Sequence, residues 1–201
     1  MNRNLAVVIQ AGGQSSRMGR DKGLVEIAGR PMIDYVIDQV ADLADDVLIT
    51  TNNINEYIQF GLRMVSDKEP GAGALPGLHT ALKGAMGSFA LVVACDMPFI
   101  NRGLLEFQIE KAFDTGADVV VPHWDGRYQT MHTVYRKETC LAAVEKALSA
   151  GEAKMTSFYD GLNVMTIGET DIAKFSPTGK SFRNINTPAE LEEAERLFVL
   201  S

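Results

Sequence analysis

Short apolar runs alternate with amphipathic segments along the first half of the chain. Valine- and isoleucine-rich runs predict β-strands at Leu5–Ile9, Val47–Thr51, Leu62–Val65 and Ala90–Ala94, and Leu24–Ile27 is a shorter apolar piece. The segments between them predict helices: one that Pro31 opens and whose apolar side chains recur at helical spacing as far as Val40, then Asn53–Phe60 and Leu75–Met86.

Strands that alternate with helices predict parallel pairing through right-handed crossovers. The expected fold class is therefore α/β: a three-layer α/β/α sandwich around a Rossmann-like, mostly parallel sheet. Burial of such a sheet on both faces explains why its strands are continuously apolar instead of alternating with polar residues.

The second half of the chain is less regular. Helices are expected at Leu104–Phe113 and Glu138–Leu148, strands at Ala117–Val121 and Met131–Tyr135, and a turn at Trp124-Asp125-Gly126. A capping box, Thr187-Pro188-Ala189-Glu190, predicts a last helix with Leu191, Ala194 and Phe198 turned inward. With 201 residues and no internal repeat or linker, residues 1–201 are predicted to form a single domain.

The composition narrows the classes of partner. A net charge of −7 argues against a general nucleic-acid or membrane-surface binder, so an anionic ligand requires cations gathered locally. Cys95 and Cys140 stand in no metal-binding spacing and are expected to be reduced. Neither a secretory signal nor a run approaching about 20 apolar residues is visible, which predicts a soluble, cytoplasmic protein.

The loop that follows the first strand gathers such cations. Gly12 and Gly13 can turn backbone N–H groups toward an anion, and Arg17, Arg20 and Lys22 follow them closely. The loop fits neither the Walker pattern nor the G-x-G-x-x-G pattern. A purely structural glycine turn would have no need of clustered cations, so the loop is predicted to bind phosphates.

Two further segments carry oxygen ligands. Asp96 follows the strand Ala90–Ala94, where open parallel sheets bind ligands, and could hold Mg²⁺, although such a residue often only caps a turn. In an extended segment Asn184 and Asn186 point to the same side, although Asn186 could simply begin the last helix. Weaker candidates are Asp67 beside a glycine-rich loop, His132, and Trp124, which could stack on a ring or fill the core.

Taken together, the motifs resemble a family of nucleotidyltransferases. The chain is similar to the family that includes the molybdenum cofactor guanylyltransferases in six stretches, in order: AGGQSSRMGRDKG, GRPMIDYV, GALPGLHTAL, VACDMPF, QTMHTVYR and FRNINTPAEL. The resemblance implies a fold of the nucleotide-diphospho-sugar transferase type. Gly12-Gly13 matches the guanylyl type of loop; Gln10 and Thr50 depart from the family pattern.

The resemblance implies transfer of GMP from GTP to the terminal phosphate of molybdopterin, with release of pyrophosphate and with Mg²⁺ as the cofactor. It assigns Arg17, Lys22 and Asp96 to catalysis, with Asp96 holding the metal. GTP would be bound by Gln10, Ala11, Gly12, Gly13, Lys22, Asn52, Asp67 and Asp96. The acceptor would be bound by His132, Arg183, Asn184 and Asn186. Transient contact with other proteins of molybdenum cofactor biosynthesis or with molybdoenzymes is a further expectation.

Two alternatives stay open at this point. One is a nucleotidyltransferase that uses CTP or another NTP with a sugar phosphate, a polyol phosphate or molybdopterin. The other is a non-catalytic protein that binds GTP or molybdopterin and releases no pyrophosphate.

Overall fold

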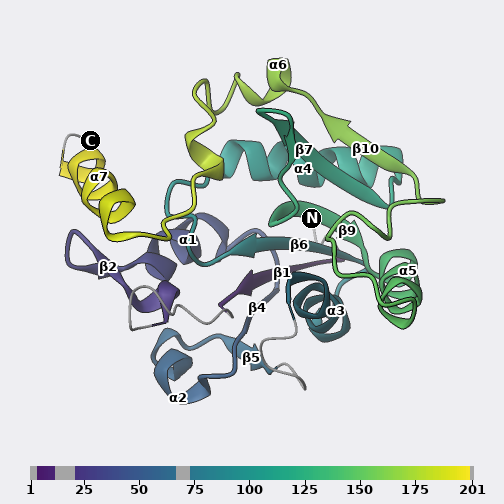
Figure 1. The fold of residues 1–201 in the computed structure, drawn as a ribbon, viewed down its shortest axis with the longest axis horizontal. Coiled ribbons are helices and arrows are strands. Elements are labelled where there is room, and N and C mark those ends of the chain that lie inside the picture. The colour runs from purple at the N-terminus through teal and green to yellow at the C-terminus, as the bar shows by residue number, and fades with distance from the viewer. Residues whose placement is uncertain (1–3, 12–20, 67–72, 200–201) are drawn as a thin grey trace.

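The computed structural model describes residues 4–11, 21–66 and 73–199, and its centre is a large twisted sheet (Figure 1). The strands are β1 (Leu5–Gln10), β2 (Glu26–Ile27), β3 (Arg30–Pro31), β4 (Asp46–Thr50), β5 (Arg63–Val65), β6 (Phe89–Ala94), β7 (Val119–Trp124), β8 (Arg127–Tyr128), β9 (His132–Arg136) and β10 (Val164–Ile167). The main sheet has the order β10-β7-β9-β6-β1-β4-β5, with β8 paired to β7, while β2 and β3 form a separate hairpin.

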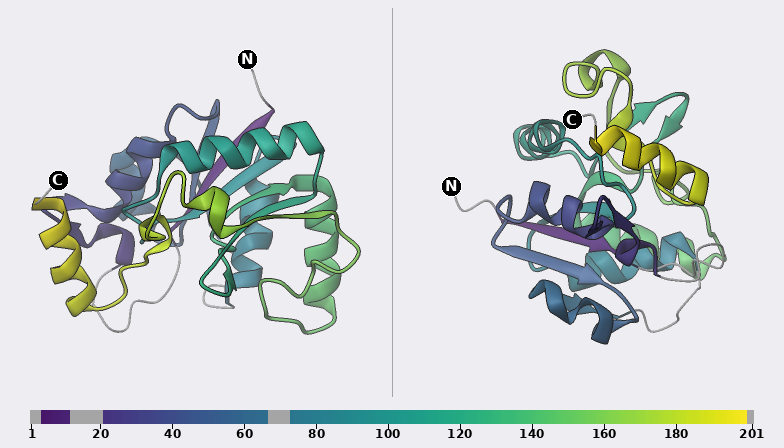
Figure 2. Two further views of the ribbon diagram at one scale, coloured as in Figure 1. Left: turned by 90° about the horizontal axis from the view of Figure 1, so that it is seen from above. Right: turned by 90° about the vertical axis from the view of Figure 1, so that its left-hand side faces the viewer.

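Helices cover both faces of the sheet. The α-helices are α1 (Met32–Val40), α2 (Ile54–Tyr57), α3 (Ala74–Gly84), α4 (Arg102–Thr115), α5 (Lys137–Ser149), α6 (Glu169–Ile172) and α7 (Pro188–Val199), and the 3₁₀ helices are η1 (Lys22–Leu24), η2 (Ile58–Phe60) and η3 (Lys180–Phe182). In Figure 2, α4 lies on one side of the sheet, with α3 and α5 on the other. This is the predicted three-layer α/β/α arrangement.

Strand β1 shows why the central strands are apolar at every position. Leu5, Val7 and Ile9 enter the core that α1 and α4 cover, while Ala6 and Val8 enter the core beneath α3 and α5. Successive side chains of a strand point to opposite faces, so a strand between two helical layers needs apolar residues at both.

The mostly parallel sheet contains one central exception. Strand β1 pairs in parallel with β4 and β6, and β10 pairs in parallel with β7. Strand β9 runs antiparallel to both β6 and β7. The chain reaches β9 from β7 through the short β8 hairpin, which leaves no room for the helical crossover that a parallel connection requires.

The strand directions bring several chain segments to one edge of the sheet. The carboxyl ends of β1, β4, β6 and β7 lie at this edge, and antiparallel β9 begins there, with His132 opposite Val93 of β6. Ligands of open α/β sheets bind at such an edge.

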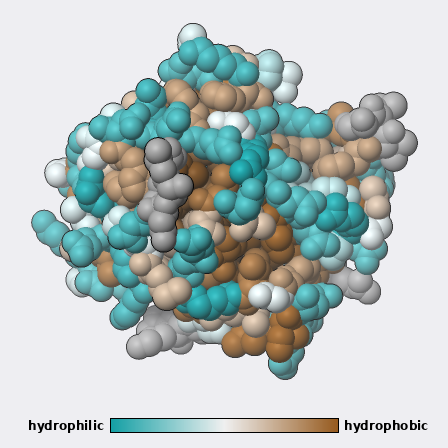
Figure 3. Space-filling view, turned by 180° about the vertical axis from the view of Figure 1, so that it is seen from behind, coloured by the Kyte–Doolittle hydropathy of each residue, from teal (hydrophilic) through white to brown (hydrophobic). Residues whose placement is uncertain are grey.

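Two further observations concern the helices and the exposed apolar side chains. None of the helices in the described ranges is both long enough and apolar enough to cross a lipid bilayer. Ile54 and Ile58 are exposed in α2 and η2, and in the rear view apolar side chains protrude at the lower right, where α2 lies (Figure 3). This apolar surface lies near β4 and β5, at the end of the sheet opposite the β7–β8 hairpin.

Candidate active site

Four of the predicted site residues meet at the end of β6. Lys22 Nζ lies 3.4 Å from Asp96 Oδ2 and 2.5 Å from Asn186 Oδ1. Asn184 Nδ2 donates to Asp96 Oδ1 at 3.0 Å. Three chain segments that are distant in sequence thus supply one polar cluster, which we call the Asp96 cluster: Lys22, Asp96, Asn184 and Asn186.

Asp96 is only 6% exposed. Burial raises its pKa, while the charge of Lys22 and the hydrogen bonds from Lys22 and Asn184 pull the pKa the other way. A buried carboxylate that is held by one ammonium and one amide is well suited to take up a further cation, because that cation would relieve the cost of burying the charge.

Lys22 is held in place by the short helix η1. Asp21 caps this helix: its carboxylate accepts from the Gly23 N–H at 3.4 Å, from the Tyr57 hydroxyl at 2.5 Å and from Asn53 Nδ2 at 3.0 Å. Tyr57 is fully buried, and burial raises the pKa of its hydroxyl, so it stays a donor. Helix η1 is therefore fastened to α2 just before Lys22 reaches toward Asp96.

The two asparagines are positioned by the backbone on either side of them. The Ile185 N–H donates to the Asp96 carbonyl at 3.0 Å, which ties this extended segment to the end of β6. Behind it the predicted capping box is confirmed: the Glu190 carboxylate accepts from the Asn186 and Thr187 N–H groups, and the Glu190 N–H donates to Thr187 Oγ1. The Asn186 backbone serves the helix start while its side chain binds Lys22, so its role at the helix start leaves the side chain free to join the cluster.

The residues expected to bind nucleotide are placed only in part. Gln10 and Ala11 lie at the end of β1, but their main chain is already used: the Gln10 carbonyl accepts from the Cys95 N–H, and the Ala11 N–H donates to the Thr50 carbonyl. Gln10 is 9% exposed, and its side-chain amide nitrogen finds no partner within the described ranges. Asn52 is exposed just beyond β4. Gly12, Gly13, Arg17 and Asp67 lie outside the described residues.

Two residues expected to bind the acceptor have their side chains engaged elsewhere. His132 is fully buried and its ring packs edge-on against Phe182, with centroids 5.1 Å apart. Burial lowers its pKa to about 4, so the ring is neutral at pH 7. Arg183 forms a two-pronged ion pair with Glu193 of α7. Both side chains therefore act structurally in this conformation.

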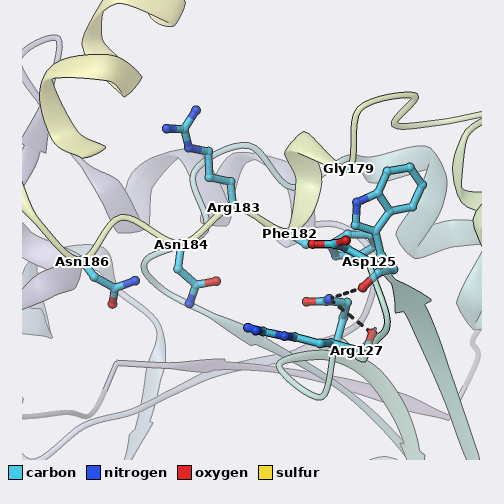
Figure 4. A pocket seen from close by; sticks show the side chains of 9 residues that line it. Asp125, Arg127, Gly179, Phe182, Arg183, Asn184 and Asn186 are labelled. Carbon is cyan, nitrogen blue, oxygen red and sulfur yellow. Dashed lines mark hydrogen bonds between the residues drawn. The ribbon is translucent and has the colours of Figure 1, made fainter. Parts of the chain in front are cut away.

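A cleft adjoins the Asp96 cluster on the side of the β7–β8 hairpin. It has a volume of about 400 Å³ and is lined by Trp124, Asp125, Arg127, Gln129, Gly179, Phe182, Arg183, Asn184 and Asn186. Figure 4 shows Asn184 and Asn186 at one end of the cleft and Asp125 and Gly179 at the other. Since Asn184 also binds Asp96, the cleft and the cluster share a wall.

The oxygen atoms of the Asp96 cluster fit Mg²⁺ better than a transition metal. The cluster offers one carboxylate and two side-chain amides, and Mg²⁺ is commonly held by one or two carboxylates together with substrate phosphates. No group of three or more His, Cys, Asp or Glu side chains in the described part of the chain could form an all-protein metal cage. The site therefore suits a hard cation that arrives with a phosphate.

Several contributors to this site carry too weak a signal to be found from the sequence alone. Asp21 is the acid of the basic loop, but its partners, Tyr57 and Asn53, belong to a different helix. Arg127 and Gln129 reach the cleft because a tight turn brings them back beside Trp124. The residues Trp124–Gly126 predict a turn, but nothing in the sequence indicates that this turn lines a cleft.

An open α/β sheet with a lysine, a buried carboxylate and two amides at the carboxyl ends of its strands has the layout of an enzyme that handles nucleotide phosphates. Residues 7–164 match the MobA-like NTP transferase domain. The chain belongs to this family of nucleotidyltransferases.

Curated relatives agree with that assignment. The chain is 37% identical over 187 residues to a probable molybdenum cofactor guanylyltransferase of Pelotomaculum thermopropionicum, covering 93% of this chain and 90% of the relative. It is 32% identical to the molybdenum cofactor guanylyltransferase of Shewanella halifaxensis, covering 96% and 94%.

Among solved structures, molybdopterin-guanine dinucleotide biosynthesis protein A of Archaeoglobus fulgidus has the same fold, with a TM-score of 0.83, 24% identity and coverage of 98% and 100%. The 2-C-methyl-D-erythritol 4-phosphate cytidylyltransferase of Thermus thermophilus shares it at a TM-score of 0.71, 17% identity and coverage of 96% and 98%. The expected fold type is thereby confirmed.

Proposed function

We propose that this protein transfers GMP from GTP to the terminal phosphate of molybdenum-loaded molybdopterin, releasing pyrophosphate and forming the guanine dinucleotide cofactor. The observation that carries the proposal is the Asp96 cluster, which stands beside an open cleft in a chain whose curated relatives are named for this activity. We further propose that the reaction takes place in the cytoplasm, with product passed to other proteins of the same pathway by transient contact.

The chemical obstacle is repulsion between two phosphates. At about 4 Å, two like unit charges repel by roughly 4 kcal/mol at an effective dielectric near 20. Arg17 and Lys22, with the N–H groups of Gly12 and Gly13, are proposed to offset this charge on the triphosphate. Asp96, with amide oxygens of Asn184 and Asn186, would hold Mg²⁺, which when bound neutralises phosphate oxygens and the departing pyrophosphate.

The acceptor phosphate is already ionised, so it needs no general base. Its oxygen forms the new bond to the α-phosphorus of GTP, while the bond to the pyrophosphate oxygen breaks and the electron pair leaves with pyrophosphate. The enzyme then contributes positioning and charge stabilisation. On the nucleotide side, Gln10, whose amide nitrogen has no partner among the described residues, is proposed to contact guanine or ribose together with Ala11, Asn52 and Asp67. A mismatched base would leave buried groups there unpaired.

The decisive experiment incubates the purified protein with Mg²⁺ and each of the four NTPs in turn, with molybdenum-loaded molybdopterin, a sugar phosphate or a polyol phosphate as the acceptor in separate reactions. We expect pyrophosphate release and dinucleotide formation with GTP. Faster turnover with CTP, or turnover only with a sugar phosphate or polyol phosphate, would contradict the assignment of substrates. Binding of GTP with no pyrophosphate from any combination would instead indicate a non-catalytic protein.

A further inference from the structure

The β7–β8 hairpin is built to turn two side chains into the cleft. Asp125 and Gly126 have left-handed φ values of 49° and 71°, which close a tight turn between Trp124 and Arg127. These two residues are cross-strand partners, so their side chains emerge on the same face of the hairpin. The next pair, His123 and Tyr128, makes its own ring contact at 5.1 Å.

The Trp124 indole forms a fixed wall of the cleft. Gly179 has a φ of +67°, and a Cβ added there would lie 2.1 Å from Trp124 Nε1. The indole thus rests directly on the backbone of Gly179, a contact that only glycine permits. Its ring centroid is 6.4 Å from that of Phe182, so aromatic surface continues along this side of the cleft.

The two arginines that line the cleft differ in their charge balance. Arg183 is paired with Glu193, and in Figure 4 its side chain extends away from Asn184. Arg127 points toward the Asn184 side of the cleft, and its guanidinium has no ion pair or hydrogen bond with any residue that the structure describes. The residues that line the cleft include one acid, Asp125, which directly precedes Gly126 in the turn. Among the described residues, Arg127 therefore offers an exposed guanidinium without an ion pair, in the cleft that adjoins the Asp96 cluster. Such a group can bind an anion.

We propose that Arg127 binds the terminal phosphate of the acceptor and holds it facing the Asp96 cluster. The inference rests on the proposed function and adds to it a residue that neither the motifs nor the relatives' names assign. A guanidinium fork can hold two phosphate oxygens at once, which fixes the orientation of the phosphate as well as attracting its charge. The aromatic wall of Trp124 and Phe182 then adjoins the non-phosphate part of the acceptor.

The test compares Arg127→Ala, Arg127→Lys and the control Arg196→Ala. Arg196 lies on α7 with a side chain 74% exposed, so the control removes the same charge from an open surface. Binding of molybdopterin is measured without nucleotide, by anaerobic equilibrium dialysis. Fluorescence of Trp124, the chain's single tryptophan, is followed in parallel as a reporter of the same cleft. Pyrophosphate release then gives KM for acceptor and GTP separately, and thermal melting checks the fold.

We expect Arg127→Ala to weaken molybdopterin binding by about tenfold or more, as for loss of a charge-assisted hydrogen bond, while KM for GTP stays unchanged. Arg127→Lys should recover part of the loss, because it keeps the charge but not the fork. Arg196→Ala should match the wild type.

Three results would overturn the inference: unchanged acceptor affinity in Arg127→Ala, a rise in KM for GTP instead, or no binding of molybdopterin by the wild-type protein. Arg127-dependent binding in a protein that releases no pyrophosphate would refute the proposed reaction and leave the binding site standing.

Discussion

Asp96 combines two properties that rarely meet in a surface aspartate. It is nearly buried, which raises its pKa, and it faces one lysine and one amide instead of bulk water. A carboxylate in this setting carries a charge whose removal changes the local field strongly, because little solvent screens it. Its chemistry should therefore be sensitive to a change that alters charge but not shape.

Replacing Asp96 with Asn is expected to lower kcat by on the order of 10²-fold or more, the usual cost of losing a preorganised electrostatic group. The amide keeps the size of the side chain but can no longer neutralise Lys22 or ligate Mg²⁺ strongly. Pyrophosphate release measures the effect, with thermal melting as the fold control. Near-normal GMP transfer in a folded variant would rule out the metal role.

His132 gives a prediction about stability instead of catalysis. Its pKa is lowered to about 4 by burial, against about 6.5 when unfolded, so between these values the unfolded chain binds more protons. Stability therefore falls as the pH drops through that window. From this residue alone, the unfolding free energy should fall by about 2 kcal/mol between pH 7 and pH 5.

The measurement is urea unfolding of the wild type and of His132→Leu at both pH values. Other groups, Asp96 among them, also titrate, so the informative quantity is the difference between the two proteins. The leucine variant should lose about 2 kcal/mol less on acidification. His123→Gln, at a half-buried histidine, serves as the control. An equal pH slope in the wild type and His132→Leu would show that the imidazole is protonated within the fold.

For individual residues, the sequence predicted which residues come together in the Asp96 cluster better than it predicted the side-chain contacts of Arg183 and His132. Asp96 could be found because it stands just beyond a strand, where the ends of parallel strands converge. Lys22 could be found from the cations of the basic loop, and Asn184 and Asn186 from their spacing in an extended segment before the last helix. The orientation of Arg183 could not be found, since it depends on Glu193 one helix away. The burial of His132 depends likewise on Phe182, which lies 50 positions along the chain.

The element that decides where Lys22 points is η1, a single short turn. Its stability comes from contacts outside itself: Tyr57 and Asn53 hold the Asp21 cap, and Gly23 is buried against its neighbours. A Cβ on Gly23 would lie 2.7 Å from the Tyr57 hydroxyl and 3.1 Å from Cys95 Sγ. The first distance is shorter than real Cβ contacts allow, so η1 or the buried Tyr57 side chain would have to shift.

Gly23→Ala is therefore expected to cost about 1–3 kcal/mol of stability, as overpacking does, and to lower kcat because it displaces Lys22. Gly168→Ala is the matched control: Gly168 has an ordinary φ of −82°, and nothing lies within 4 Å of the added carbon. Thermal melting and pyrophosphate release are measured on both. Equal behaviour of the two variants would show that η1 tolerates the shift and does not set the position of Lys22.

Most elements were predictable because their signals are local. Hydrophobic runs gave β1, β4, β5 and β6, and the capping box gave the start of α7, each within a residue or two. Strand β10 and helix α6 were not predicted, because four-residue elements offer too little periodicity to read. The antiparallel direction of β9 also escaped, since it follows from the shortness of its connection and not from any pattern within the strand.

Across the whole molecule, β1, which precedes the glycine-rich loop in the chain, and the β7–β8 hairpin lie on opposite sides of β6. The glycine-rich loop follows β1, while the cleft is formed by the β7–β8 hairpin, and the Asp96 cluster stands at the end of the strand between them. The chain carries a net charge of −7, so attraction of anions has to come from the cations at this edge and not from the overall field. Because the two substrates are proposed to bind in separate regions, we expect both to be bound at the same time when GMP is transferred.

A covalent route would need a protein nucleophile to hold GMP between two half-reactions. The nearest thiol, that of Cys95, is 5% exposed, lies beside Gly23, and burial raises its pKa well above the usual range, so no thiolate is available at neutral pH. With that thiol unavailable, we expect direct attack by the acceptor phosphate. Initial rates with both substrates varied should give intersecting double-reciprocal plots, the sign of a ternary complex.

Incubation with α-labelled GTP and Mg²⁺ alone should in turn leave no label on the denatured protein. Cys95→Ser should retain turnover if it folds, as judged by melting. Parallel kinetic plots together with labelled protein would reverse this conclusion, because they would show that GMP rests on the enzyme before the acceptor arrives.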